Sequence, residues 1–205
     1  MWSCSLILAL VMVLSLVSCS KEKGPDSTIT AFCNAMKTYD TAAMKNCVVG
    51  GSEIEDDFSL SEEMPAGILE HFVKLAGKMS YSITASEVNE TTATVTVKFN
   101  YSDITPIMTA TMGEYLAQAF ALAFSGASDE TMDTLFETIF AEKSASVEPT
   151  TAEKTVIFSC EKTDSGWKIS DIPEDALHVL TCNIASAFEG LANLGGSGSS
   201  ADSEK

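Results

Sequence analysis

The spacing of hydrophobic positions along this sequence of 205 residues switches between two periods. In the first part, apolar residues recur every three or four positions, which predicts helices near 28–38 and 42–48 and a third helix capped at 61–63. The period then becomes two, which predicts strands at 80–88 and 91–101 joined by a tight turn. One face of the second strand is apolar and consists of Val95, Val97, Phe99 and Tyr101.

The helical period returns in the second half of the chain. It predicts two helices at about 104–125 and 129–142, the first of them ended by a glycine. A second hairpin is expected next, with strands at 153–162 and 167–172 around a polar turn that contains glycine. A last helix is predicted from 173 to about 190.

This order of elements predicts an α+β fold. We expect helices packed on a curved antiparallel sheet made of two hairpins, with a helical insertion at about 104–142 between the hairpins. Residues 28–192 are long enough to form a single domain with its own core. The tail at 193–205 is rich in glycine and serine and is expected to be disordered.

The N-terminus carries the pattern of a processed export signal. An apolar run from Leu6 to Val17 is too short to span a bilayer and has the length of a signal-peptide core. It ends in Leu16-Val17-Ser18-Cys19, the pattern that bacterial lipoproteins show at their cleavage site. We therefore predict a signal peptide at 1–18, a lipid on Cys19, a polar tether at 19–27, and a location on the outer face of the cell membrane. No Lys or Arg precedes the run, so either the true start lies a few residues away or the signal is atypical. The alternative to the lipid anchor is an ordinary secretory signal with an unmodified Cys19.

The charge balance excludes one class of partner. The chain has 29 acidic and 12 basic residues, a formal net charge of −17. Nucleic-acid binding needs clustered Lys and Arg to neutralise phosphates, and no such stripe is present in the sequence. The acidity is typical of a soluble surface protein, and the membrane is expected to be a partner only through the lipid.

Short segments of the chain resemble a known group of proteins. The strand, glycine turn and Trp-Lys-Ile of the segment 162–169 are similar to the last hairpin of uncharacterised bacterial surface lipoproteins with a nuclear-transport-factor-like (cystatin-like) cone. The start of the chain resembles the opening helices of the same proteins at Ala31-Phe32 and Tyr39-Asp40. The predicted insertion resembles theirs at Glu114-Tyr115-Leu116. The resemblance implies an α+β cone and a surface location, and it implies no activity.

The two histidines do not form a recognisable catalytic centre. His71 has Gly67, Ile68, Lys74 and Leu75 at helical spacing, which indicates a solvent-facing or edge position. His178 shares a predicted helical face with Glu174 and Cys182, a possible but incomplete metal site. The acidic cluster at 53–57 lacks the ligand spacing of a calcium-binding loop, so we expect it to form a solvent-exposed loop. We therefore predict a protein that is not an enzyme and that holds no metal or cofactor.

Four cysteines remain if Cys19 is lipidated. An even number in an exported chain suggests two disulfides. If the first two predicted helices are antiparallel, the rise per residue of a helix places Cys33 and Cys47 at the same height along them. The rise of the strand and of the last helix likewise places Cys160 and Cys182 at the same height, so we predict these two bridges. The alternative is that all four are free and act as small hydrophobic residues.

Two function classes follow from these observations. The first is a non-catalytic binding module for an envelope protein, a peptide or a glycan. The second is a carrier or enzyme for a small apolar ligand inside the cone, where only Tyr81 and Tyr101 would supply polar groups. A filled cone with exposed apolar residues favours the first class, and a deep pocket in the cone favours the second.

Overall fold

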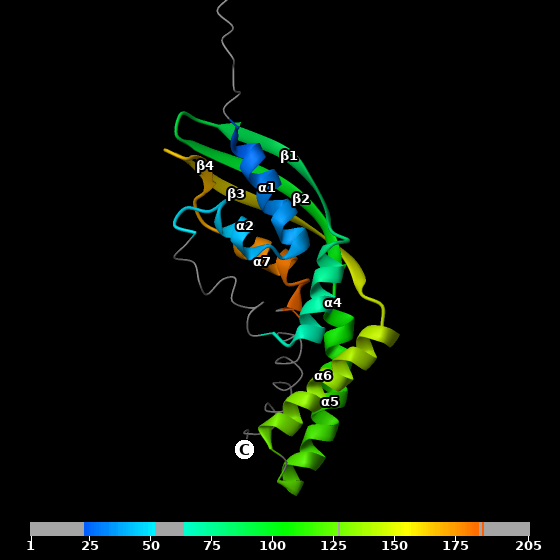
Figure 1. The fold of residues 1–205 in the computed structure, drawn as a ribbon. Helices are drawn as coiled ribbons and strands as arrows, with labels where there is room; N and C mark the ends of the chain where they lie inside the picture. Colours follow the sequence, from blue (N-terminus) through cyan, green and yellow to red (C-terminus); the bar gives the residue numbers. More distant parts are fainter. Residues whose placement is uncertain (1–22, 52–63, 127, 185, 187–205) are drawn as a thin grey trace, which may run out of the picture.

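The segments with a period of two form a four-stranded antiparallel sheet in the computed structural model, which describes residues 23–51, 64–126, 128–184 and 186. The strands lie side by side in chain order, β1-β2-β3-β4. Their bounds are Ser80–Val88 for β1, Thr92–Asp103 for β2, Thr150–Thr163 for β3 and Gly166–Ile169 for β4. Both predicted hairpins are confirmed, and the pairing of β2 with β3 joins them into one open sheet (Figure 1).

Three helices pack on one face of this sheet (Figure 1). They are α1 (Pro25–Thr38), α2 (Thr41–Lys45) and α7 (Glu174–Leu180). Apolar residues of these helices, such as Phe32 and Val179, belong to the same buried cluster as the inward residues of β2 and β3. The α+β class predicted from the periodicity is therefore confirmed.

The alternation predicted for β2 is confirmed by the packing. Val95, Val97 and Phe99 are fully buried, whereas Lys98 and Asn100 on the opposite face are exposed. In the core, the ring of Phe158 on β3 lies with its centroid 5.7 Å from that of Phe32 and 6.4 Å from that of Phe99, both edge to face. Full burial of such a side chain stabilises the fold by about 1.5–3 kcal/mol. Side chains of this kind fill the space between the sheet and the three helices.

A pair of long helices projects away from the sheet (Figure 1). They are α5 (Thr105–Ser125) and α6 (Asp129–Ser146), and they stand between β2 and β3 along the chain, where the helical insertion is predicted. Gly126 follows α5 with a φ of 74°, a left-handed conformation that glycine adopts without strain. Ser128 caps α6 by accepting a hydrogen bond from the backbone N–H of Thr131.

The remaining described helix, α4 (Ala66–Ala76), lies against α6 near the base of this pair. Its apolar stripe forms a second buried cluster with residues from the start of α5, from α6 and from the turn after α7. The members of this cluster are Ile68, Phe72, Leu75, Ile104, Ile107, Met108, Phe140 and Cys182. The fold therefore has two cores, one under the sheet and one between α4 and the projecting helices.

The helix predicted at 173–190 is interrupted, because α7 ends at Leu180 and the chain turns there; residues 185 and 187–190 of that prediction lie outside the described residues. Cys182 and Asn183 have positive φ values of 51° and 67°, which no α-helix accommodates. The turn is held by two bonds from distant parts of the chain. The side-chain amide of Asn183 donates to the carboxylate of Asp103 over 2.8 Å, and the N–H of Ile104 donates to the carbonyl of Cys182 over 3.0 Å.

The second helix is also shorter than predicted, ending at Lys45 instead of continuing to residue 48. The chain after it pairs with β4. The N–H of Val49 donates to the carbonyl of Ile169, and the N–H of Ile169 donates to the carbonyl of Cys47. The segment thereby covers the edge of a short strand whose backbone groups would otherwise be unpaired.

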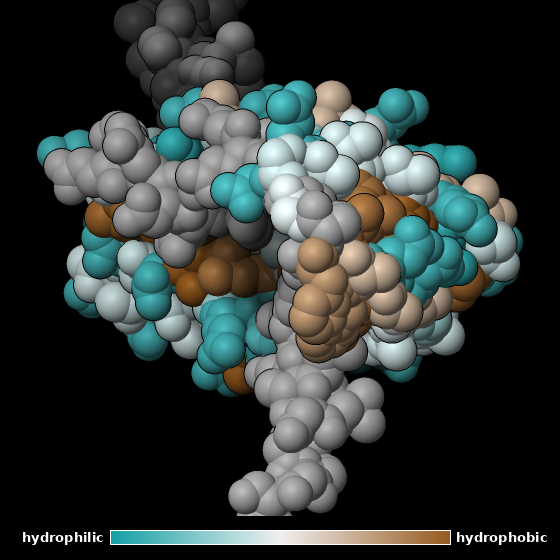
Figure 2. All heavy atoms as spheres, turned by 90° about the horizontal axis from the view of Figure 1, so that it is seen from below, coloured by the Kyte–Doolittle hydropathy of each residue, from teal (hydrophilic) through white to brown (hydrophobic). Residues whose placement is uncertain are grey.

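Apolar residues reach the surface among hydrophilic ones, as the view from below shows (Figure 2). On α5, Leu116, Phe120 and Phe124 are 45%, 67% and 91% exposed. Their four-residue spacing places them on one side of the helix, and we call them the α5 stripe. Within the described residues, none of the helices combines the length and the apolar character that crossing a membrane requires.

Candidate functional site

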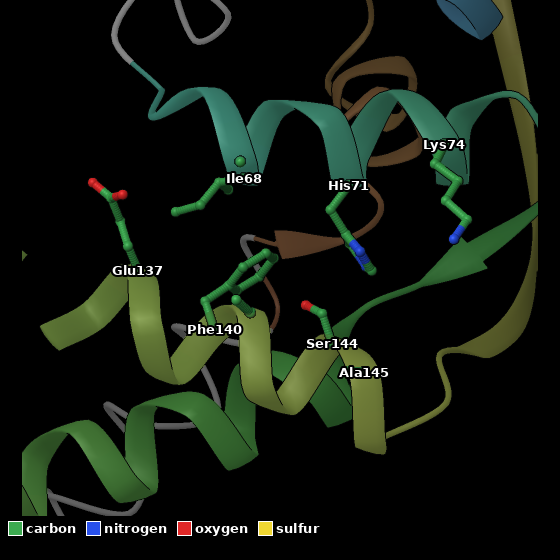
Figure 3. Close-up of a pocket in the computed structure, with 9 residues that line it drawn as sticks. Ile68, His71, Lys74, Glu137, Phe140, Ser144 and Ala145 are labelled. Carbon is green, nitrogen blue, oxygen red and sulfur yellow. The ribbon is translucent and has the colours of Figure 1, made fainter. Parts of the chain in front are cut away.

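A pocket of about 390 Å³ opens between α4 and α6 (Figure 3). Helical periodicity places its lining on facing sides of the two helices, since residues three, four and seven positions apart share a face. The lining residues are Gly67, Ile68, His71 and Lys74 on α4, and Glu137, Phe140, Ala141, Ser144 and Ala145 on α6. Its volume is within the range of sites that bind small molecules.

Two polar atoms in this pocket have no protein partner. Nε2 of His71 and Oγ of Ser144 are both buried, and neither is hydrogen bonded to any described group. The two side chains point toward one another from opposite helices in Figure 3. A buried polar atom that stays unpaired costs about 1–3 kcal/mol, so natural proteins pair nearly all of them. These atoms therefore mark a place where a ligand would gain hydrogen bonds that the folded chain does not supply itself.

The surroundings of His71 favour the neutral form of its imidazole. Burial lowers the pKa of His71 below its ordinary value, and the nearby ammonium groups of Lys74 and Lys78 lower it further. The ring packs edge to face with that of Phe140, with the ring centroids 5.5 Å apart. A neutral imidazole can donate or accept a hydrogen bond, so His71 can meet either kind of ligand atom.

Opposite charges lie at the two ends of the pocket (Figure 3). Lys74 stands at the end that contains His71 and Ser144, and Glu137 stands at the end near Ile68. Both charged side chains are exposed, so they face water at the rims. Between them, Ile68 and Phe140 supply an apolar wall. The pocket thus offers a positive end, an apolar middle and a negative end.

The sequence did not predict this site. The spacing of Gly67, His71 and Lys74 on one helical face is visible in the sequence, but it indicated a solvent-facing or edge position for His71. His71 is instead half-buried because α6 packs opposite it and contributes Ser144. Periodicity identifies the face of each helix, whereas only the tertiary structure decides which two faces meet.

His178 does not form the metal group that its helical spacing with Glu174 and Cys182 left open as an alternative. It interacts with Glu174, with 3.6 Å between Nε2 and the carboxylate, and its Nδ1 lies 3.4 Å from the side-chain oxygen of Asn183. Cys182 is turned into the second core, because the helix ends before it. Among the described residues, no three His, Cys, Asp or Glu side chains gather closely enough to bind a metal ion. The acidic cluster at 53–57 and Cys19 lie outside the described residues.

The four cysteines are buried free thiols, so neither predicted disulfide is formed in the structure. Cys47 does not stand on a helix antiparallel to α1, because α2 ends two residues before it, and its thiol donates to the carbonyl of Ala43. Cys160 and Cys182 belong to different cores, since the chain turns after α7. The alternative reading, in which these cysteines act as small hydrophobic residues, describes the packing.

Burial also makes the thiols unreactive. Desolvation raises the pKa of Cys33 and of Cys182 to about 12, and that of Cys160 to about 11. A neighbouring carboxylate adds to the effect for two of them, Asp103 for Cys182 and Asp26 for Cys160, and the thiolate form of Cys47 would add to it for Cys33. The thiolate is the reactive form, and it is scarce at pH 7 under these conditions.

We therefore expect the native protein to react slowly with iodoacetamide. After unfolding without a reductant, all four thiols should react, which intact-mass measurement would show as four adducts on Cys33, Cys47, Cys160 and Cys182. Four adducts would exclude both bridges. Fewer adducts, together with a cross-linked peptide containing Cys33 and Cys47, would contradict the free-thiol state.

Comparison with known proteins provides little further guidance. No protein-family model matches the sequence, and no curated protein matches it significantly. Among solved structures, the chain is similar to one from Bacillus subtilis described as a "putative lipoprotein", with 17% sequence identity and a TM-score of 0.39. The similarity covers 73% of this chain and 43% of that one, so this chain spans less than half of its length. At this TM-score, neither the fold nor the function of this chain is inferred from it.

Proposed function

We propose that this chain is a lipid-anchored protein of the outer face of a bacterial membrane, with a domain that binds a ligand without transforming it. The pocket between α4 and α6 is the proposed site. The observation that carries the proposal is the pair of buried, unpaired polar atoms in it, Nε2 of His71 and Oγ of Ser144. A ligand that bonds both atoms would recover the free energy that their burial costs.

The filled core argues against the alternative of a small apolar ligand inside the cone. Tyr101 is buried in the first core, and Tyr81 lies at its edge, where its hydroxyl donates to the side-chain oxygen of Asn34 over 2.9 Å. Neither hydroxyl lines the pocket between α4 and α6. The packed interior and the exposed α5 stripe are the combination that favours a binding module.

The arrangement around Ser144 supports binding over catalysis. A nucleophilic serine needs a general base within hydrogen-bond reach and N–H donors aimed at the oxyanion. Ser144 stands within the last turns of α6, and its Oγ makes no hydrogen bond to His71. In the described part of the chain, no carboxylate is hydrogen bonded to His71 to orient the imidazole as a base.

The anchor and the finer fold assignment are further parts of the proposal. Leu16-Val17-Ser18-Cys19 supports the lipid anchor. The bent strands with α1, α2 and α7 on one face support a relationship to nuclear-transport-factor-like cones (Figure 1). The pocket lies outside this cone, between α4 and the projecting helices, so its ligand would be held beside the sheet rather than inside it.

A substitution that fills the pocket tests its role in binding. A Cβ atom at Gly67 would meet no atom within 4 Å, so Gly67→Leu should fold normally and occupy the pocket. Gly113→Leu on α5 is the matched control, since a Cβ there also meets open space and Gly113 does not line the pocket. Both changes remove a helical glycine, which stabilises a helix by about 0.5–1 kcal/mol.

We expect a panel of amino acids, short peptides, carboxylic acids and monosaccharides to contain at least one ligand. At about 100 times its dissociation constant, a ligand stabilises the folded state by about 2.7 kcal/mol. Addition of the ligand should therefore raise the melting temperature of the wild type and of Gly113→Leu above that of the same protein without ligand. The melting temperature of Gly67→Leu should be the same with and without ligand. Equal shifts in all three proteins, or no shift with any compound, would contradict the proposed site.

A further inference from the structure

The positions of the polar groups along the pocket define the shape of the ligand. On α6, Glu137 and Ser144 are seven residues apart, which corresponds to about 10 Å along the helix axis. Gly67 and Lys74 have the same separation on α4. Figure 3 shows the two helices side by side, with Glu137 near Ile68 and with Ser144 near His71 and Lys74. The negative end and the hydrogen-bonding, positive end are therefore about 10 Å apart.

The positive end suits a carboxylate. The ammonium group of Lys74 and the hydroxyl of Ser144 can both donate hydrogen bonds, and Nε2 of a neutral His71 can donate a third. Hydrogen bonds to a charged acceptor are stronger than those between neutral groups. Among the described residues that line the pocket, Glu137 is the only acidic one, and it stands at the other end. A carboxylate would therefore bind at the His71 end and be repelled from the Glu137 end.

The negative end suits an amine, and the middle suits an apolar group. The carboxylate of Glu137 can accept hydrogen bonds from an ammonium group. Ile68 and Phe140 lie between the ends and offer an apolar surface. A single amino acid is too short to reach both ends. An extended chain of three residues spans about 10 Å, since each residue adds at most about 3.3–3.6 Å.

We propose that the pocket binds short peptides of about three residues with free ends, placing the carboxylate at His71, Lys74 and Ser144 and the amine at Glu137. This inference rests on the proposed function and adds the class of ligand. An apolar side chain in the middle of the peptide contacts Ile68 and Phe140. The peptide backbone is held by its two ends, so its sequence matters less than its length and its free termini.

The tripeptide Ala-Leu-Ala is a suitable probe, and the histidines report its binding. The chain has two histidines, His71 in the pocket and His178 outside it. Addition of the peptide to the purified protein in detergent micelles should shift the imidazole proton signals of His71 in the NMR spectrum. The signals of His178 should stay in place. A shift of His178 alone, or of neither histidine, would overturn the inference.

Derivatives of the probe test each end. The peptide with a C-terminal amide should bind at least about tenfold more weakly than the free acid, because the amide lacks the negative charge that the three donors recognise. The N-acetyl form should bind up to about fivefold more weakly, since the carboxylate of Glu137 is exposed to water and contributes less. The amide binding as tightly as the free acid would overturn the inference.

Two variants connect these effects to particular residues. In Glu137→Gln, the peptide with a free amine and the N-acetyl peptide should bind with equal affinity. The free acid should still bind more tightly than the C-terminal amide. Glu142→Gln, on the same helix but outside the pocket, should leave both affinity differences as they are in the wild type. Ser144→Ala should weaken the free peptide about tenfold without lowering the melting temperature of the unliganded protein, because Oγ of Ser144 has no partner to lose. A purely structural serine would show the opposite result, lower stability with unchanged binding.

The result with the compound panel separates the two proposals. If a compound other than a peptide stabilises the wild type and Gly113→Leu but not Gly67→Leu, and no peptide does so, the pocket is a binding site and the peptide inference is wrong. If no compound, peptides included, distinguishes these proteins, both proposals are wrong.

Discussion

Replacement of Cys19 by alanine is expected to abolish fatty-acid labelling of the protein. The thiol of Cys19 is the attachment point that Leu16-Val17-Ser18-Cys19 predicts. Two acyl chains bind a membrane far more firmly than one, since each buried methylene contributes about 0.8 kcal/mol. The effect should therefore be close to complete. Labelling with a fatty-acid analogue in a bacterial host measures it.

Cys4 provides the matched control for this experiment. It is a cysteine in the same N-terminal segment, but no apolar run precedes it. Cys4→Ala should therefore leave labelling and partition as they are in the wild type. Unchanged labelling of Cys19→Ala would rule out the predicted anchor. Loss of the label in Cys4→Ala would point to a different modified cysteine.

Trp167→Ala is expected to destabilise the domain severely. Trp167 on β4 is 8% exposed and belongs to the first core, as its alternation with Lys168 predicts. Its backbone carbonyl also accepts a hydrogen bond of 2.9 Å from the hydroxyl of Thr28 on α1. Truncation of a buried tryptophan to alanine typically costs about 3–5 kcal/mol. For a domain of this size, each kcal/mol lowers the melting temperature by about 2–4 °C.

An apolar residue on the opposite face of the sheet shows whether burial is the cause. Ile157 on β3 is 60% exposed, so Ile157→Ala should change the free energy of unfolding by no more than about 0.5 kcal/mol. Thermal unfolding followed by circular dichroism compares the two variants. Equal melting temperatures for Trp167→Ala and the wild type would mean that the register of β4 is shifted by one residue.

The elements of the fold could be predicted from the sequence because local patterns determine them. The alternation of Val95, Val97 and Phe99 with polar residues defines which face of β2 is buried, independently of what covers it. Asp40 is a favourable cap wherever a helix follows it, and it accepts the N–H of Ala43 over 2.9 Å at the start of α2. The order of strands and helices then restricts the chain to an α+β fold with the helical pair between the hairpins.

The ends of two elements could not be predicted, because distant residues decide them. The apolar pattern of the last helix continues past Leu180, but bonds from Asp103 and Ile104 favour the turn at Asn183. The pairing of Val49 with Ile169 likewise draws the chain away from a longer second helix. The predicted disulfides were argued from longer helices at the same two places; the four thiols are free in the structure, and the alkylation experiment tests the bridges.

By itself, the sequence determined the periodicity of each segment, the buried face of each strand and the candidate lipid site at Cys19, since each depends on residues close together in the chain. Only the tertiary structure decided that α4 packs beside α6. This packing brings His71 and Ser144 together and leaves both without a partner. Local sequence restricts the faces that a helix can present, but the choice between apolar faces of similar character depends on the packing of the whole chain. The candidate site arises from that choice.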